Sequence, residues 1–195
     1  MAVDSKLIQQ LREQTGAGIL DAKKALEEVG GNYDKAVELL RKRGQKVAAK
    51  KADRVATEGL VEAYIHGQGR VGVLVRVNCE TDFVARTDKF KELAHQLAMH
   101  VAAFDPSYIS RTDVPAEVLE TEKGIHLEVL KKEGKPADIA EKILVGKLDK
   151  YYGEMCLLEQ AFVLDDKRTV QDIINEKIAE LGENIQVTGF KRMAL

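Results

Sequence analysis

The sequence predicts an α+β protein, in which three short N-terminal helices precede a core that combines a small antiparallel sheet with helices. Apolar residues recur at helical spacing over residues 4–44, and from Gly59 the period changes to that of strands. The helical period returns after Asp88, and "NIQVTGFKRM" ends the chain as a further strand pattern. We therefore expect about three strands, with two early ones joined to the last, packed with helices and a helical hairpin.

Residues 1–45 are predicted to form a three-helix module. Apolar positions of its successive helices are Leu7, Ile8 and Leu11, then Ala22, Leu26 and Val29, then Ala36, Val37 and Leu40. Gly16 and Gly18 separate the first two helices, Gly30 and Gly31 end the second, and Asn32 is expected to cap the third. Gly44 is expected to end that helix.

Residues 46–57 are predicted to form a basic helical linker. The segment around it contains many cations and few large apolar side chains: Arg41, Lys42, Arg43, Lys46, Lys50, Lys51 and Arg54. Such a run is typical of a solvated connection, and a nucleic-acid-binding arm is the alternative. The linker interpretation is favoured because no aromatic residue lies between the charges to stack on bases.

Residues 58–195 are predicted to form the α+β core, which begins with the strand patterns "GLVEAYI" and "RVGVLVRVN". Between and within them, Gly67, Gly69 and Gly72 match the spacing of a dinucleotide-binding fingerprint. That fingerprint requires a helix after the glycines, so that phosphate can meet a helix N-terminus, whereas here a strand follows. The glycines therefore indicate a β-hairpin turn.

Four further helices are expected in the core. A helix capped by Thr87 or Asp88 is expected to run to about Ala103. A helical hairpin is expected at about residues 115–152, with helices over 116–132 and 136–148 around the turn "EGKP". The last helix is expected to begin near Thr169 and to end at Gly182. Its inward positions are Val170, Ile173, Ile174, Ile178 and Leu181.

Composition limits the classes of function. The 30 Lys and Arg nearly balance the 32 Asp and Glu, so the net charge of -2 does not indicate nucleic acid as the main partner. Cys79 and Cys156 lack metal-ligand spacing, which is typical of reduced thiols in a cytosolic protein. The first residues contain charges and no unbroken apolar run, so we expect a soluble, cytoplasmic protein that does not bind membranes.

The sequence does not contain a convincing catalytic arrangement. His95 and His100 lie five residues apart on one predicted helix, so they face different sides rather than one zinc site. No P-loop, nucleophile elbow or zinc-pair motif is present. The sequence favours a binding protein over an enzyme, and neither a cofactor nor a metal is expected.

Phe83 stands out in "VNCETDFVAR", where the strand pattern has stopped and the helical pattern has not begun. Connections between elements mostly run over the surface and often bind partners. One interpretation is that Phe83 fills the core at this junction. The other is an exposed interface anchor, because Asp82 beside it must stay solvated or paired.

Five segments, in order along the chain, carry a resemblance to a known family. The longest are "LREQTGAGILDAKKAL" and "GVLVRVNCETDFVAR", and "GKPADIAEKILVGKL", "LLEQAFV" and "VTGFKR" follow. They resemble the bacterial translation elongation factor Ts family in its short form. The resemblance implies that the N-terminal module has a fold like that of ubiquitin-associated domains. It also implies a nucleotide exchange factor that binds elongation factor Tu with GDP or without nucleotide, and that makes no direct contact with nucleic acid.

The resemblance further implies which residues bind the partner. The motif that reaches the partner's helices beside the nucleotide and displaces its Mg²⁺ falls here on Thr81, Asp82, Phe83 and Val84. In the N-terminal module the implied contacts are Arg12, Ile19 and Leu20. Ile19 and Leu20 occupy positions that are often methionine in the family, and Ala161 stands where "LLEQPFV" would have proline.

A two-fold homodimer assembled through the small sheet is predicted. About three strands are few for independent stability, and such a sheet leaves an apolar face or edge available for pairing. A second copy could supply the sheet-bearing subdomain that longer members of the resembled family carry. A monomer whose helical hairpin covers the sheet is the alternative.

Two other functions remain open from the sequence. An RNA-associated or ribosome-associated protein could use the basic linker and the helical hairpin. An adaptor of the ubiquitin-associated type could bind a partner without accelerating nucleotide exchange.

Overall fold

The computed structural model describes residues 3–195 and confirms the predicted α+β class. Met1 and Ala2 of the predicted module lie outside the described residues. The helices are α1 (Ser5–Thr15), α2 (Ile19–Glu28), α3 (Tyr33–Lys51), α4 (Asp82–Ala85), α5 (Asp88–Phe104), α6 (Ala116–Lys132), α7 (Ala137–Met155) and α8 (Val170–Leu181). The strands are β1 (Glu58–His66), β2 (Val71–Cys79), β3 (Ala161–Phe162), β4 (Asp165–Thr169) and β5 (Gln186–Ala194).

The N-terminal helices α1, α2 and α3 surround a small apolar core of their own. Its fully buried members are Leu11, Ala22, Ala25, Leu26 and Ala36. The Asn32 side chain accepts a hydrogen bond from the backbone N–H of Lys35 at 3.0 Å and so caps α3, as predicted. Gly16 adopts a left-handed conformation that ends α1.

The prediction that Gly44 ends the third helix is wrong, because α3 continues through it to Lys51. Gly44 faces α8, where an added Cβ would lie 3.8 Å from Ala179 Cβ and from the Asn175 carbonyl oxygen. A small residue at this position lets two helices approach closely. One turn later Ala48 is buried in the central core, so α3 contributes to both cores.

The central sheet has the strand order β1-β2-β5 and is antiparallel, so the last strand pairs with the early hairpin as predicted. The turn between β1 and β2 contains Gly67 and Gly69 with positive φ, which confirms the hairpin interpretation of the glycine motif. On β2, Val73, Val75 and Val77 face the core, and the outward face is more exposed.

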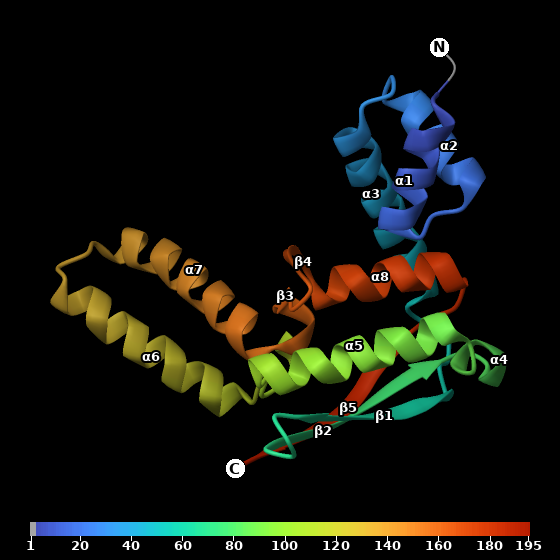
Figure 1. Ribbon diagram of the computed structural model, residues 1–195. Coiled ribbons are helices and arrows are strands. Elements are labelled where there is room, and N and C mark those ends of the chain that lie inside the picture. The colour runs from blue at the N-terminus through green and yellow to red at the C-terminus, as the bar shows by residue number, and fades with distance from the viewer. Residues whose placement is uncertain (1–2) are drawn as a thin grey trace.

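The core is built in layers (Figure 1), with α5 lying over the sheet and α8 over α5. The apolar faces of these two helices form most of the helical side of the core: Phe90, Leu93, Leu97 and Val101 from α5, and Val170, Ile173, Ile174 and Ile178 from α8. The helix α3 then packs on α8, which places the N-terminal module at the far side of α8 from the sheet.

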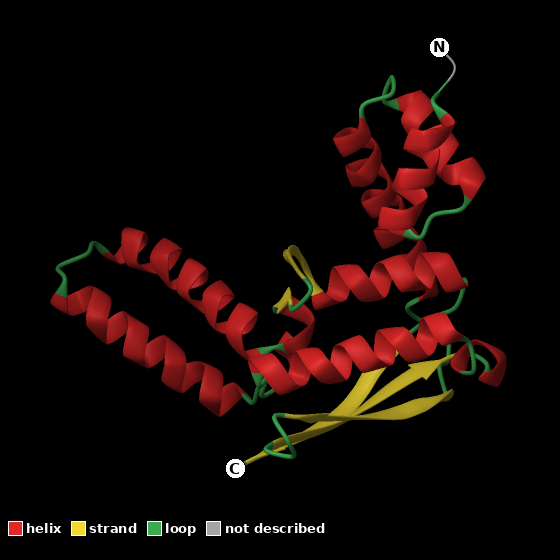
Figure 2. Ribbon diagram, in the orientation of Figure 1, coloured by secondary structure: helices red, strands yellow, loops and turns green. Residues whose placement is uncertain are grey.

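Helices α6 and α7 form the predicted antiparallel hairpin, which projects from the core (Figure 2). Its second helix runs to Met155, beyond the predicted end at Leu148. At its base, Arg111 bonds Glu159 and Asp149, and its guanidinium carbon lies 4.4 Å from the centre of the Tyr152 ring. These contacts attach the hairpin to the core.

His100 is fully buried between aromatic rings and is fixed by two hydrogen bonds. Its Nδ1 accepts from the backbone N–H of Val163 at 3.2 Å, so Nε2 carries the proton that is donated to Gln160 Oε1 at 2.9 Å. The Phe104 and Phe162 rings stack on the imidazole at centroid distances of 4.7 and 5.9 Å. Burial lowers the pKa of His100 from its ordinary value.

The free energy of unfolding is expected to fall in mild acid because of His100. The unfolded chain binds a proton below pH about 6.5, whereas the folded chain keeps His100 neutral to lower pH. The free energy of unfolding keeps its full value above the pKa of His100 in the unfolded chain. It decreases as the pH falls towards the pKa of His100 in the folded chain, by at most about 1.4 kcal/mol per pH unit. Urea denaturation between pH 5 and 7.5 should show a shallower pH dependence for His100→Gln. The exposed His95→Gln is the control, and equal pH dependence in wild type and His100→Gln contradicts the prediction.

Candidate partner-binding surfaces

Phe83 is 78% exposed, which makes the core-filling interpretation wrong. Phe83 lies in α4, a single turn of helix between β2 and α5. The turn is attached to the core by one side, because Ala85 is buried and Val84 packs against the main apolar cluster. The backbone is thus held while the phenyl ring points away from the core.

The first turn of α4 is capped by Thr81, whose hydroxyl oxygen accepts a hydrogen bond from the Val84 backbone N–H at 3.4 Å. The Thr81 hydroxyl in turn donates to Glu183 Oε1 at 2.7 Å. Asp82 forms an ion pair with Arg86 at 2.8 Å, in which both side chains are substantially exposed. Exposed pairs of this kind contribute little to stability, so Asp82 can exchange partners at low cost.

The predicted contacts of the N-terminal module lie at the start of α2 and along α1. Ile19 and Leu20 are 58% and 70% exposed, directly after the glycine turn. Arg12 Nε donates to the Ala17 carbonyl oxygen at 3.3 Å, which fixes the guanidinium against the same turn. A surface groove of about 420 Å³ is lined by Ser5, Ile8, Gln9, Arg12, Glu13 and Ile19. The structure thus brings Arg12 and Ile19 together, with Leu20 next to them.

The C-terminal end of α8 lies between the module and the start of α5, which follows α4. The Glu180 carboxylate lies against Gly16, where an added Cβ would be 3.0 Å from Glu180 Cδ. Its oxygens accept from Lys89 Nζ at 2.5 Å and from Lys177 Nζ at 2.7 Å. Burial alone would raise the pKa of Glu180, but these two lysines outweigh it and hold the pKa below its usual value.

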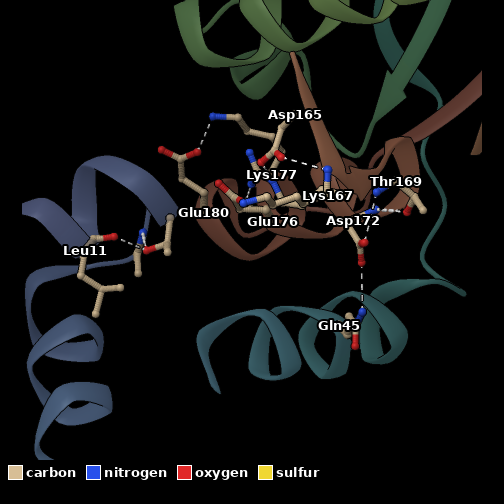
Figure 3. A network of polar contacts seen from close by, with 12 residues as sticks. Leu11, Gln45, Asp165, Lys167, Thr169, Asp172, Glu176, Lys177 and Glu180 are labelled. Carbon is tan, nitrogen blue, oxygen red and sulfur yellow. Dashed lines mark hydrogen bonds and ion pairs between the residues drawn. The ribbon is translucent and has the colours of Figure 1, made fainter. Parts of the chain in front are cut away.

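A polar contact joins the module to the start of α8, at the opposite end of that helix from Glu180. Gln45 Nε2, on the second half of α3, donates to Asp172 Oδ1 at 3.0 Å (Figure 3). Asp172 also accepts from the backbone N–H of Thr169, which completes a capping box at the start of α8. The two predicted binding segments do not share one pocket, because the groove beside Ile19 is lined only by residues of the N-terminal module.

Sequence reasoning missed Glu183, which contacts the candidate motif directly. Glu183 Oε2 accepts from the backbone N–H groups of Glu80 and Thr81, each at 3.0 Å. About one hundred residues separate these groups in the chain, and no local pattern connects them. The only available signal was the position of Glu183 just after the predicted helix end at Gly182.

Within residues 3–195, the side chains of His, Cys, Asp and Glu do not form any group of three or more that could hold a metal ion. No helix in this part of the chain has the length and apolar character needed to cross a bilayer. Cys79 and Cys156 are free thiols, and burial raises the pKa of each to about 11.

Comparison with known proteins identifies the family. A family model described as elongation factor TS matches residues 5–195. Relatives named elongation factor Ts include one from Fervidobacterium nodosum, 52% identical over all of this chain and 99% of the relative. One from Thermotoga petrophila is 57% identical over 98% of this chain and 96% of the relative, and one from Moorella thermoacetica is 59% identical over 95% and 91%. The chain therefore belongs to the elongation factor Ts family, a family of translation elongation factors.

Proposed function

We propose that this chain binds elongation factor Tu in its GDP-bound form and promotes release of GDP, so that GTP can enter. The observation that carries the proposal is the exposed phenyl ring of Phe83 on a fixed turn of helix. A large aromatic side chain held outside the core is a typical interface anchor. Family membership supports elongation factor Tu as the partner and the cytoplasm as the place of action.

The proposed mechanism needs no covalent chemistry and no cofactor on this chain. Mg²⁺ that bridges a nucleotide's phosphates and the side chains of its protein requires near-ideal octahedral oxygen geometry. Phe83, inserted between helices beside the nucleotide, would move these oxygens and release the ion, which loosens the diphosphate. Coupling is reciprocal, so a factor that lowers affinity for GDP is itself bound less tightly when nucleotide is present. Rebinding of GTP then expels it.

The exposure of the two binding segments supports a division of labour. The surface of Arg12, Ile19 and Leu20 belongs to a module with its own apolar core and would supply affinity. The nucleotide site of elongation factor Tu would be contacted by the second segment, which consists of Thr81, Asp82, Phe83 and Val84. The α3 helix, which belongs to both cores, would hold the two at a fixed distance.

The direct test is the release of fluorescently labelled GDP from purified elongation factor Tu. We expect the wild-type chain to accelerate release in proportion to its concentration until saturation. An adaptor of the ubiquitin-associated type would bind the partner without acceleration. An RNA-binding protein would instead be retained on RNA with a steep salt dependence. Either of these results would contradict the proposal.

The double substitution Ile19→Asp with Leu20→Asp is expected to raise the half-saturating concentration for GDP release by about tenfold or more. Both positions are exposed in the free chain, but the complex would bury the two introduced carboxylates, which would then have to lose their water. The rate at saturation should change much less. Deleting residues 1–50 is a poorer test than this pair, because it would remove Ala48 from the central core.

Val145→Asp is the matched control for the pair. Val145 is an exposed apolar residue on α7, away from the N-terminal module. Its substitution should leave the half-saturating concentration unchanged. An unchanged value for the pair as well would remove the N-terminal surface from the proposed binding site.

We further propose that the working unit is a homodimer with a two-fold axis through the small sheet. Helix α5 covers one face of the sheet, and the outward face carries exposed apolar side chains: Val61, Ile65, Leu74 and Met193. The α6–α7 hairpin projects from the C-terminal end of α5 and does not cover this face of the sheet (Figure 1). A two-fold axis would bury the same patch on both chains.

Light scattering coupled to size exclusion should give a dimer mass for wild type at micromolar concentration. Leu74→Glu should convert the dimer to a monomer, because it places a charge on the middle strand of the face that the dimer would bury. Ile125→Glu, at an exposed apolar position on α6, is the control. A monomeric mass for wild type together with full exchange activity would leave the dimer without support.

A further inference from the structure

The half-buried carboxylate of Glu183 accepts three hydrogen bonds from residues 80–81, which form the corner between β2 and α4. Its Oε2 accepts from the backbone N–H of Glu80 and of Thr81 at 3.0 Å each, and its Oε1 accepts from the Thr81 hydroxyl at 2.7 Å. Glu183 follows Gly182, whose left-handed conformation ends α8 and turns the chain towards this corner. A residue far away in sequence thus holds the segment from which Phe83 projects.

The contact is reciprocal and extends to the end of α3. Glu80 Oε1 accepts from the backbone N–H of Asn184 at 2.7 Å, and the pKa of Glu80 is lowered chiefly by this bond. The Asn184 side chain is buried, and its Nδ2 donates to the carbonyl oxygens of Ala52 at 3.2 Å and Arg54 at 2.8 Å. Three segments therefore meet at residues 183–184: the end of α3, the corner before α4, and the turn after α8.

The chemistry of the three donors explains why a carboxylate is suited to this position. Two N–H groups and one O–H group converge, and an ionised carboxylate is an acceptor at every lone pair. Because the Thr81 hydroxyl donates its proton to Glu183, its oxygen lone pairs face Val84 and accept from that N–H. Glu183 therefore sets the direction of the hydroxyl that caps α4.

We propose that Glu183 is a positioning residue for nucleotide exchange, which fixes the orientation of α4 and hence of Phe83 through Thr81. The proposal rests on the exchange function proposed above. Glu183 acts within the chain, since all three of its bonds are to residues 80 and 81, and it does not need to touch the partner. A misoriented α4 would still allow binding through the N-terminal module but would no longer place the phenyl ring productively.

The test is a saturation curve for release of labelled GDP from elongation factor Tu, measured for wild type, Glu183→Ala and Glu183→Gln. Glu183→Ala should lower the rate at saturation about tenfold, because charge-assisted hydrogen bonds are the strong ones and all three are lost. Glu183→Gln should fall between the two. Its one oxygen can still accept from both N–H groups, while its amide nitrogen faces the Thr81 hydroxyl.

Glu159→Ala is the matched control. Its carboxylate also accepts more than one hydrogen bond, from Arg111, but at the base of the α6–α7 hairpin. A general loss of folding would reduce the active fraction, which raises the apparent half-saturating concentration and leaves the rate at saturation unchanged. A positioning role predicts the opposite pattern, with the rate at saturation reduced. A wild-type rate at saturation in both Glu183 variants overturns the proposal.

Amide hydrogen exchange separates failure of this proposal from failure of the proposed function. In Glu183→Ala, the amides of residues 80–87 should exchange faster, while those in the middle of α5 keep their wild-type protection. Unchanged protection at residues 80–87 overturns the positioning role, whether or not the wild-type chain accelerates GDP release. If wild type fails to accelerate release while protection is lost, only the exchange function is refuted. If Glu183→Ala does not fold, Glu183→Gln decides both measurements.

Discussion

Replacing Phe83 with alanine is expected to slow GDP release from elongation factor Tu about thirtyfold or more, since truncating an interface anchor costs about 2 kcal/mol or more. The thermal midpoint should hardly move, because a residue that is 78% exposed gives up little buried area when it is truncated. Stopped-flow release with a fluorescent GDP, alongside thermal melts, measures both quantities. Asp82→Ala should act in the same direction, because its exposed pair with Arg86 contributes little to folding.

Leu164→Ala is the control for the Phe83 experiment. Leu164 is a large exposed apolar residue in the turn between β3 and β4. Its truncation should affect neither GDP release nor the thermal midpoint. A Phe83→Ala variant that melts much earlier and yet releases GDP at the wild-type rate would show that the ring serves folding rather than exchange.

Gly59→Ala is expected to destabilise the fold by about 3 kcal/mol or more, through steric overlap and backbone strain together. Gly59 lies near the start of β1 with φ of 142°, in a region that L side chains rarely adopt. An added Cβ would lie 2.1 Å from the Val77 carbonyl oxygen and 2.8 Å from Asn78 Cα, both on the paired strand. Neither obstacle is a flexible side chain, so β1 and β2 would have to separate. Urea denaturation followed by circular dichroism measures the loss.

Gly124→Ala provides the matched control for Gly59→Ala. Gly124 lies within α6, and an added Cβ would meet nothing within 4 Å. Alanine is the better helix former, so this change should stabilise the protein by up to about 1 kcal/mol. If Gly59→Ala unfolded at the same urea concentration as Gly124→Ala, the close strand approach at residue 59 would not be a constraint on folding.

The long periodic elements could be predicted from the sequence because their patterns record which side is buried. The alternation over Val71–Val77 predicted β2, and the apolar spacing after Thr169 predicted α8 and its inward face. The cap at Asn32 marked the start of α3 correctly, and of the two caps expected for α5, Thr87 or Asp88, the structure has Thr87. Periodicity could not settle Phe83, because α4 is four residues long and a single turn is too short to show a period.

Contacts between distant segments were beyond the reach of the sequence. Gly44 resembles a helix end when only its neighbours are considered, and its role becomes clear only with α8 beside it. The small β3–β4 pair was missed, because β3 has two residues and β4 is largely charged. Glu183 was missed because its donors lie more than one hundred positions earlier in the chain.

Helix α3 runs without a break through both cores, so its length sets the orientation of the N-terminal module relative to α4. One residue inserted in α3 between Leu40 and Gly44 would turn the module by about 100° and shift it by about 1.5 Å along the helix axis. Ile19 would then face a different direction relative to Phe83 and Gly16 would leave Glu180, although each core could keep the contacts among its own buried residues. Length variation in α3 is therefore expected to cost activity before it costs folding. The turn at 133–136, at the free end of the α6–α7 hairpin, has no comparable phase to keep.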